Sequence, residues 1–276
     1  MPELPEVETV VRQIRPRLVG RAFTGCEVTW KRTLGGLDAR AFARAVVGAR
    51  VARVWRRAKY IVVDLERSGR PAGALLGHLR MTGRMQVDDP AADPGPFVKV
   101  SLALDDRRIF HFIDVRKFGR LEFTRDVEGE LAALGPEPLS DAFDVATFLA
   151  GLRSKRRALK PLLLDQAFVA GLGNIYVDES HFLAGLHPLA RSERTTRDRA
   201  SKLHAAIRSV LSAAIEREGS SFDTFYRTPE GSPGAYQDQF QVYGREGEPC
   251  RRCKTPISRI VVGQRGTHFC RRCQRR

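Results

Sequence analysis

The chain has 276 residues with 42% hydrophobic and 29% charged side chains, a composition that supports one large or two ordinary domains and excludes wholesale disorder. Its formal net charge of +15 at pH 7 predicts a polyanionic partner, nucleic acid first and an anionic membrane surface second. Because the sequence has no run of about 18 apolar residues and no apolar segment near Met1, we expect neither a membrane span nor a secretion signal.

The first predicted element is an amphipathic helix that begins near Pro5 and ends before Gly20. Glu3, Glu6 and Glu8 lie at its start, where acidic side chains stabilise the positive end of the helix dipole. Its apolar stripe consists of Leu4, Val7, Val11, Ile14 and Leu18.

Pro2 gives this helix start a possible second role, because removal of Met1 would leave Pro2 with a free secondary amine. An α-amino group titrates at about 8, against about 10.4 for a lysine side chain, so far more of it is neutral at pH 7. The N-terminal segment is therefore either a well-capped helix start only, or a helix start that also presents a nucleophile.

Short segments bounded by Gly, Pro or Asp fill the first half of the chain and are typical of an antiparallel sandwich. The predicted strands are Tyr60 to Leu65, Ala74 to Met81, Val98 to Leu104 and Arg108 to Ile113. The stiff segment from Gly135 to Pro138 marks a domain boundary. After it, helical periodicity predicts Ala142 to Leu152, Leu159 to Gln166, Ile175 to Leu183 and Arg197 to Glu216 as helices.

Four cysteines near the C-terminus follow the pattern C-x2-C-x16-C-x2-C, which is typical of a four-thiolate zinc site. The stretch from Pro249 to Arg276 is too short and too polar to form a core without metal. A pair of disulfides is the alternative, disfavoured by the missing secretion signal. We expect one structural Zn²⁺ bound by Cys250, Cys253, Cys270 and Cys273, with Cys26 uninvolved.

Two strands are predicted between the cysteine pairs, Ile257 to Val262 and Thr267 to Phe269, around the turn from Gly263 to Gly266. The chain from Arg245 onward carries ten basic and two acidic residues. Arg265 is therefore expected at the tip of a basic hairpin, where it either enters a DNA groove or is merely solvated.

Several motifs in a fixed order make the chain resemble formamidopyrimidine-DNA glycosylase, the bacterial repair family for oxidised purines. They are MPELPEVETV, RRAKY from Arg56, HLRMTGR from His78, DVRKFGR from Asp114, GLGNIYVDE from Gly171, QVYGREGEPC from Gln241 and the terminal cysteine motif. The resemblance implies an α+β fold. It consists of an N-terminal antiparallel β-sandwich flanked by helices (1–134), a helix-two-turn-helix DNA-binding domain (135–240) and a β-hairpin zinc finger (241–276).

The resemblance also implies a bifunctional DNA glycosylase and abasic-site lyase of base excision repair, which excises 8-oxoguanine and formamidopyrimidines. Pro2 would attack the sugar C1′ and form a Schiff base, and β- and δ-elimination would then cleave the strand. Glu3 matches the acid that handles protons at the sugar, Lys59 the lysine of β-elimination, and Arg265 a phosphate-binding arginine of δ-elimination. Glu6 matches a glutamate near the lesion pocket.

Other matched residues imply DNA handling. Met81, Arg116 and Phe118 match a wedge that fills the gap left by an everted nucleotide, although a Met and a Phe at strand ends are ordinarily core residues. Val115 replaces a common proline of this loop, so we expect a less rigid wedge. Phosphate contacts are expected from His78, Lys155, Lys160 and Asn174. The loop from Thr228 to Gln237 is interpreted either as a lid over the everted base or as a linker.

Two alternatives stay open at this point: an oxidised-pyrimidine glycosylase of the endonuclease VIII type, and a noncatalytic zinc-containing DNA-binding protein. Leu4 favours the purine branch, because the endonuclease VIII branch typically begins with a PEGPE-like sequence. The implied partner is double-stranded DNA containing oxidised purines, with no membrane partner. The implied state is a monomer located in the bacterial cytoplasm and associated with the nucleoid.

Overall fold

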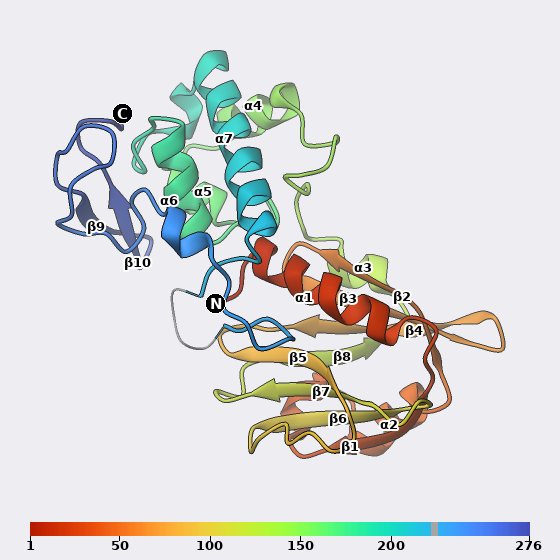
Figure 1. Ribbon diagram of the computed structural model, residues 1–276. Helices are drawn as coiled ribbons and strands as arrows, with labels where there is room; N and C mark the ends of the chain where they lie inside the picture. The colour runs from red at the N-terminus through yellow and green to blue at the C-terminus, as the bar shows by residue number, and fades with distance from the viewer. Residues whose placement is uncertain (222–225) are drawn as a thin grey trace. The chain divides into compact units, whose positions relative to one another are not determined.

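The computed structural model describes residues 1–221 and 226–276, which form two compact units (Figure 1). The first unit contains Met1–Ala132 and Glu218–Ala235, and the second contains Ala133–Arg217 and Tyr236–Arg276. Within the described part of the chain, no helix is long and apolar enough to cross a membrane. The chain thus leaves the first unit and returns to it for one short segment.

Two antiparallel four-stranded sheets build the first unit and confirm the predicted sandwich (Figure 1). The strands are β1 Phe23–Val28, β2 Arg50–Arg57, β3 Tyr60–Arg67, β4 Arg70–His78, β5 Gly83–Asp88, β6 Val98–Leu104, β7 Ile109–Asp114 and β8 Arg120–Thr124. One sheet has the order β2-β3-β4-β8 and the other β1-β6-β7-β5. Period-2 alternation directs side chains such as Phe110 and Phe112 into a shared apolar core.

Helices close both open sides of this sandwich. The helices are α1 Leu4–Leu18, α2 Ala39–Val46 and the short α3 Val127–Leu131, with a 3₁₀ turn, η1, at Lys31–Leu34. Helix α1 packs against the edge strands β2 and β5, whereas α2 packs against the opposite edges β1 and β8. The predicted stripe of α1 is buried along its whole length, so the N-terminal residues are held against the sheet edges.

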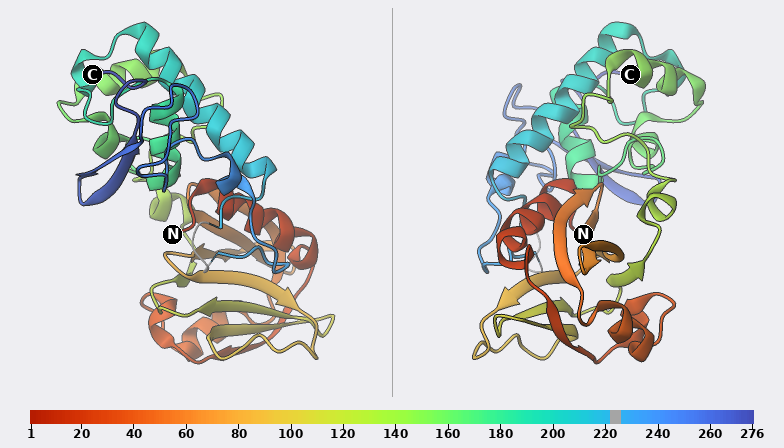
Figure 2. Two further views of the ribbon diagram at one scale, coloured as in Figure 1. Left: turned by 60° about the vertical axis from the view of Figure 1, so that its left-hand side comes forward. Right: turned by 90° about the vertical axis from the view of Figure 1, so that its right-hand side faces the viewer.

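The second unit consists of helices and one β-hairpin (Figure 2). Its elements are α4 Val145–Ser154, α5 Leu159–Leu163, α6 Asn174–Leu183, η2 Ser192–Arg194, α7 Arg197–Glu216, η3 Tyr236–Gln239, β9 Ser258–Val262 and β10 Arg265–Phe269. Helix α7 has the predicted bounds, and it packs against α4 and α6. Helix α5 ends earlier than predicted, and Gln166 instead bonds the following loop through Leu164 O, Leu172 O and Gly171 N–H.

The segment that returns to the first unit packs on α1. Ser220 N–H donates to the Glu6 carboxylate at 2.8 Å, and the Gln13 side chain bonds Glu218 at 3.0 Å and Glu230 N–H at 3.3 Å. The described part of this segment therefore contacts α1 on both sides of residues 222–225. Whether the loop from Thr228 onward acts as a lid stays a prediction.

Candidate active site and nucleic-acid interface

Pro2, Glu3 and Glu6 are all buried at the start of α1. Glu3 N–H donates to Glu6 Oε2 at 2.8 Å, while Glu6 Oε1 accepts Ser220 N–H at 2.8 Å. Only 3% of Glu3 is exposed, and its side chain accepts the backbone N–H of Glu6 in a capping box at the start of α1. The sequence did not assign a role to Ser220, because its contact with Glu6 spans more than 200 residues.

Lys59 lies in the turn between β2 and β3, and only 5% of it is exposed. Arg56 connects this turn to α1, since its Nε donates to Glu8 Oε2 at 2.9 Å and its Nη1 donates to Ala58 O at 3.0 Å. Burial raises the pKa of Glu8, but hydrogen bonds and charge from Arg56 and Arg12 outweigh burial and hold this pKa below its ordinary value. The ionised Glu8 therefore fixes the turn that carries Lys59 against the N-terminal helix.

His78 lies on the strand next to this turn, because the pairing of β3 with β4 places it directly opposite Tyr60. Their rings make an edge contact at 4.8 Å, and the Arg80 N–H donates to His78 Nδ1 at 3.0 Å. Burial, with help from the positive charges of Arg80 and Lys59, lowers the pKa of His78 to about 3. The ring is neutral at pH 7 with its proton on Nε2, and it can donate that proton to a phosphate oxygen.

The predicted wedge residues lie on two adjacent loops of the first unit. Phe118 is 52% exposed, and the Arg116 guanidinium lies 5.1 Å from the centre of its ring. Met81 is half-buried on the turn between β4 and β5. Phe118 is therefore not part of the core, and an exposed aromatic ring stacked with an arginine suits insertion into a base stack.

Lys160 differs from the expectation of a direct phosphate contact, because it is 0% exposed. Its ammonium is 2.6 Å from Asp178 Oδ1 and also donates to Gly266 O at 3.2 Å. Asn174 Nδ2 donates to the same carbonyl at 3.0 Å, and Asp178 Oδ2 accepts the His268 N–H at 2.8 Å. A buried charge needs a partner, so these residues bind the finger hairpin to α5 and α6.

Arg265 is exposed, but it flanks the tip of the hairpin instead of forming it. The tip is Gly263 and Gln264, whose φ angles of +54° and +62° make a two-residue turn, and Arg265 pairs with Val262 as the first residue of β10. Lys155 is exposed at the end of α4. Both side chains are thus accessible to a polyanion.

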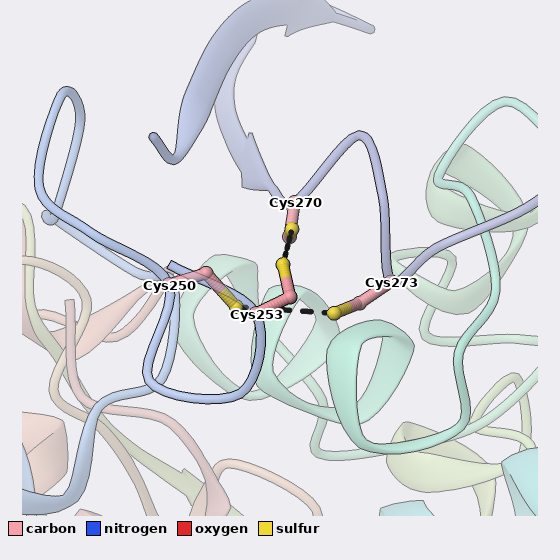
Figure 3. A group of neighbouring side chains, drawn as sticks. All are labelled: Cys250, Cys253, Cys270 and Cys273. Atoms are coloured by element: carbon pink, nitrogen blue, oxygen red, sulfur yellow. Dashed lines mark hydrogen bonds between the residues drawn. The ribbon is translucent and has the colours of Figure 1, made fainter. Parts of the chain in front are cut away.

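The four predicted zinc ligands converge in the second unit (Figure 3). Their sulfur atoms all lie within 4.8 Å of one another, with Cys250 and Cys273 separated by 3.9 Å and Cys253 and Cys270 by 3.4 Å. A tetrahedral Zn²⁺ with Zn–S bonds of about 2.3 Å requires sulfurs about 3.8 Å apart, whereas a disulfide requires about 2 Å. The donor set therefore fits zinc, and all five cysteines are free of disulfides.

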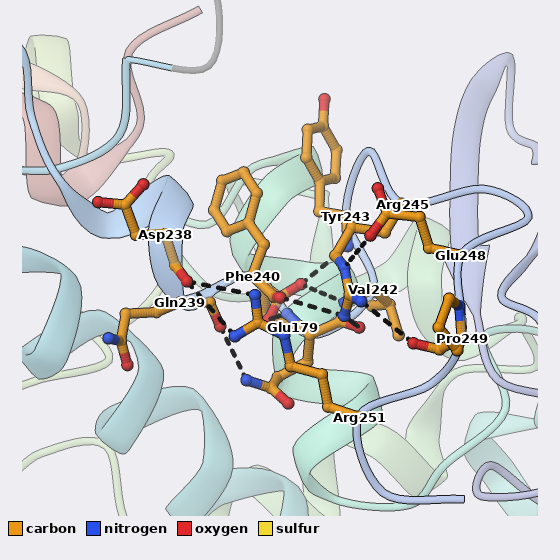
Figure 4. A network of polar contacts seen from close by, with 11 residues as sticks. Glu179, Asp238, Gln239, Phe240, Val242, Tyr243, Arg245, Glu248, Pro249 and Arg251 are labelled. Carbon is orange, nitrogen blue, oxygen red and sulfur yellow. Dashed lines mark hydrogen bonds and ion pairs between the residues drawn. The ribbon is translucent and has the colours of Figure 1, made fainter. Parts of the chain in front are cut away.

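Glu179 is a buried carboxylate that received no role from the sequence (Figure 4). It accepts the backbone N–H groups of Gln241, Val242 and Tyr243 at 2.9, 3.0 and 2.9 Å. Burial raises the pKa of Glu179, and the three N–H groups oppose this shift in part. Glu179 thus holds the segment that leads into the cysteine module against α6.

Family models match nearly the whole chain. The formamidopyrimidine-DNA glycosylase N-terminal domain matches residues 1–121, the H2TH domain of the same enzyme matches 134–226, and a zinc finger found in FPG and IleRS matches 247–276. The three matches follow one another along the chain in the order expected from the motifs.

Individual relatives agree with these models over full length. The formamidopyrimidine-DNA glycosylase of Chloroflexus aggregans is 47% identical, covering 99% of this chain and 98% of its own, and that of Geobacillus kaustophilus is 40% identical over 100% of both. Among solved structures, a Lactococcus lactis FPG variant bound to Fapy-dG-containing DNA superimposes with a TM-score of 0.91 at 36% identity, covering 100% of both chains. The Thermus thermophilus protein gives 0.87 at 40% identity, covering 99% and 98%.

Proposed function

This chain belongs to the formamidopyrimidine-DNA glycosylase family, and we propose that Pro2, Glu3 and Lys59 carry out its chemistry. The protein is a DNA glycosylase with AP lyase activity that excises oxidised purines in base excision repair. The observation that best supports the residue assignment is a nearly buried lysine on a turn bound to the helix that follows Pro2. The proposed chemistry is therefore located at the start of α1 and on the turn between β2 and β3.

Once Met1 is removed, the Pro2 nitrogen attacks the sugar C1′, and the bond between C1′ and the damaged base breaks, leaving its electron pair on the base. The nitrogen loses its one proton, and the sugar ring then opens as the C1′–O4′ bond breaks and O4′ takes up a proton. The product is an iminium that stays cationic, because a secondary amine has no second proton to lose. This cation acidifies the C2′ hydrogen, and removal of that proton expels the 3′ phosphate in β-elimination. A second elimination expels the 5′ phosphate.

Glu3 and Lys59 supply the proton transfers in this proposal. The carboxyl of Glu3, the buried residue that follows Pro2, exchanges protons with the sugar ring as the base departs. Lys59, on the turn that Arg56 binds to α1, acts in β-elimination. Glu6 orients the segment by accepting Glu3 N–H and Ser220 N–H, which supports its assignment to the edge of the lesion pocket.

For DNA binding, we assign direct phosphate contacts to His78, Lys155 and Arg265, which are respectively a neutral donor and two exposed cations. Lys160 and Asn174 act differently, by fixing Gly266 next to Arg265. Met81, Arg116 and Phe118 form the wedge. A structural Zn²⁺ bound by the four cysteines would cross-link the finger, which has only a small core of its own.

Several broader assignments complete the proposal. We retain the division into residues 1–134, 135–240 and 241–276 as functional domains, supported by the limits of the family models. The partner is double-stranded DNA with oxidised purines, since related proteins are solved with Fapy-dG and 8-oxo-G DNA. We further propose a monomer without a membrane partner, working in the cytoplasm at the nucleoid of a bacterium.

Replacing Glu3 should impair base excision much more than cleavage of an abasic site. We expect Glu3→Gln to slow excision of 8-oxoguanine by at least about 100-fold, the usual contribution of a positioned acid or base. Cleavage of a preformed abasic site should fall far less, because no base has to leave. Single-turnover rates on the two substrates measure this, with Glu27→Gln on the exposed face of β1 as control. An equal loss on both substrates would refute the role of Glu3 in base departure.

Affinity for undamaged duplex should fall steeply with salt, because the +15 chain releases counterions from DNA. Lys155→Ala should lower the slope of log K against log salt concentration by about 0.9, the value for one lost phosphate contact. Lys202→Ala, which removes an exposed lysine paired with Asp198 on α7, should leave the slope unchanged. If the two variants have the same slope, Lys155 makes no phosphate contact.

A further inference from the structure

We propose that Asp114 and Thr82 are positioning residues that hold the wedge ready for insertion into DNA. The inference rests on the proposed wedge role of Met81, Arg116 and Phe118. Thr82 directly follows Met81, and Asp114 ends β7 just before the loop that carries Arg116 and Phe118. Both loops connect the two sheets of the sandwich, one from β4 to β5 and the other from β7 to β8, and they meet at these two side chains.

Asp114 is 0% exposed and receives hydrogen bonds from both loops. The Thr82 hydroxyl donates to Asp114 Oδ1, and the Arg116 N–H donates to the same oxygen at 3.2 Å. The Gly119 N–H donates to Oδ2 at 2.7 Å. One carboxylate therefore fixes both ends of the segment from Arg116 to Gly119, which contains the exposed Phe118.

Thr82 completes this network. Its Oγ1 accepts the Arg116 N–H at 3.1 Å while its own hydrogen goes to Asp114, so the hydroxyl is used as both donor and acceptor. Thr82 is itself buried, and the Met81 backbone cannot move without disturbing it. The positions of Met81 and Arg116 are thus coupled through a single hydroxyl group.

The rest of the loop also has little freedom. A Cβ on Gly119 would lie 2.6 Å from the Phe112 ring and 3.1 Å from Asp114 Oδ2. Only glycine therefore fits at this position without a shift of its neighbours. Lys117 takes a φ of +62° and places its ammonium 4.4 Å from the centre of the Trp30 ring. These contacts restrain the loop in which Val115 stands at the position of a common proline.

Restraint of the wedge loops affects the insertion of the wedge into the base stack, and it does not affect the elimination reactions. A pre-positioned wedge avoids the entropy cost of ordering its side chains when it enters the stack, whereas the eliminations take place at the start of α1. Loss of the Thr82 hydroxyl should therefore slow the opening of duplex DNA. It should leave cleavage of an abasic site in single-stranded DNA unchanged, since a single strand has no stack to fill.

The test compares Thr82→Val, which removes the hydroxyl but keeps the shape, with Thr82→Ser, which keeps the hydroxyl. Thr124→Val on β8 is the matched control, because Thr124 Oγ1 also accepts a backbone N–H, from Asp126, outside the wedge. Three quantities are measured on the zinc-loaded full chain. They are the fluorescence change of 2-aminopurine beside 8-oxoguanine in a duplex, the single-turnover excision rate on that duplex, and cleavage of an abasic site in a single strand.

We expect Thr82→Val to slow the fluorescence change and duplex excision about tenfold, as for the loss of one hydrogen bond to a charged group. Single-strand cleavage should not change, and Thr82→Ser and Thr124→Val should stay within about twofold of the unaltered chain. Asp114→Asn should show the same split, provided that its thermal unfolding matches that of the unaltered chain. Slower single-strand cleavage by Thr82→Val would overturn the proposal, because it would indicate general damage.

Phe118→Ala separates this proposal from the one on which it rests. If Phe118→Ala loses the fluorescence change but Thr82→Val retains it at full rate, the wedge is real and Thr82 does not position it. If Phe118→Ala and Arg116→Ala both behave like the unaltered chain, the wedge assignment itself is wrong. Either result overturns the role given to Asp114 and Thr82.

Discussion

Acetylation of the Pro2 nitrogen is expected to abolish base excision and strand cleavage together, with rates at least about 1000-fold lower, as for removal of an essential nucleophile. An amide nitrogen has no available electron pair for attack on C1′, and it cannot form an iminium. Acetylation should therefore abolish both excision and abasic-site cleavage, whereas Glu3→Gln should mainly slow excision. Single-turnover assays on both substrates measure the effect.

The matched control is the same chain carrying an N-terminal fusion, assayed before and after a protease exposes Pro2. The blocked form should bind lesion DNA yet remain inactive, and the processed form should recover full rate. Pro2→Gly retains a primary amine and should keep part of its activity. A fused chain that works at the rate of the processed chain would show that the nucleophile lies elsewhere.

Removal of zinc is expected to lower DNA affinity by at least about 100-fold, because a structural zinc site supplies about 10 kcal/mol or more of folding free energy. The apolar cluster around the cysteines is small, consisting of Phe182, Val242, Cys250, Ile257 and Cys270. Without the metal, this cluster cannot hold β9 and β10, and Arg265 loses its fixed place. Cys253→Ser should contain less than one zinc per chain and should bind DNA weakly.

Cys26→Ser is the control for this prediction, because Cys26 lies on β1 in the first unit. It should keep one zinc per chain and unaltered affinity for DNA, as determined by metal analysis and binding titration. Full affinity in a zinc-free chain would contradict the structural role of the metal. Loss of zinc from Cys26→Ser would contradict the ligand assignment.

Much of the fold could be predicted, because local patterns determine it. The alternation from Val98 to Leu104 identifies β6 with its observed bounds, and the periodicity from Arg197 to Glu216 does the same for α7. The zinc cluster follows from the spacing of four cysteines alone. In each case, the informative residues are neighbours in the sequence, and the physical period of the element fixes their spacing.

The pairings within the sites were beyond sequence reasoning, because they join residues far apart in the chain. The sequence predicts a phosphate contact for Lys160, because no local pattern shows that its ammonium forms a buried ion pair with Asp178. Arg265 was placed at the tip because the positive φ of Gln264 is not visible in the sequence. The network of Asp114 and Thr82 likewise spans 32 residues and depends on how two loops meet.

The most direct test of the central claim is to map the covalent complex with lesion DNA. Borohydride reduces the iminium between enzyme and sugar to a stable amine, and peptide mass analysis then locates the attached sugar. We expect the adduct on the N-terminal peptide that begins with Pro2, at its α-nitrogen. An adduct on Lys59, or on any other lysine, with an unmodified N-terminal peptide would contradict the account.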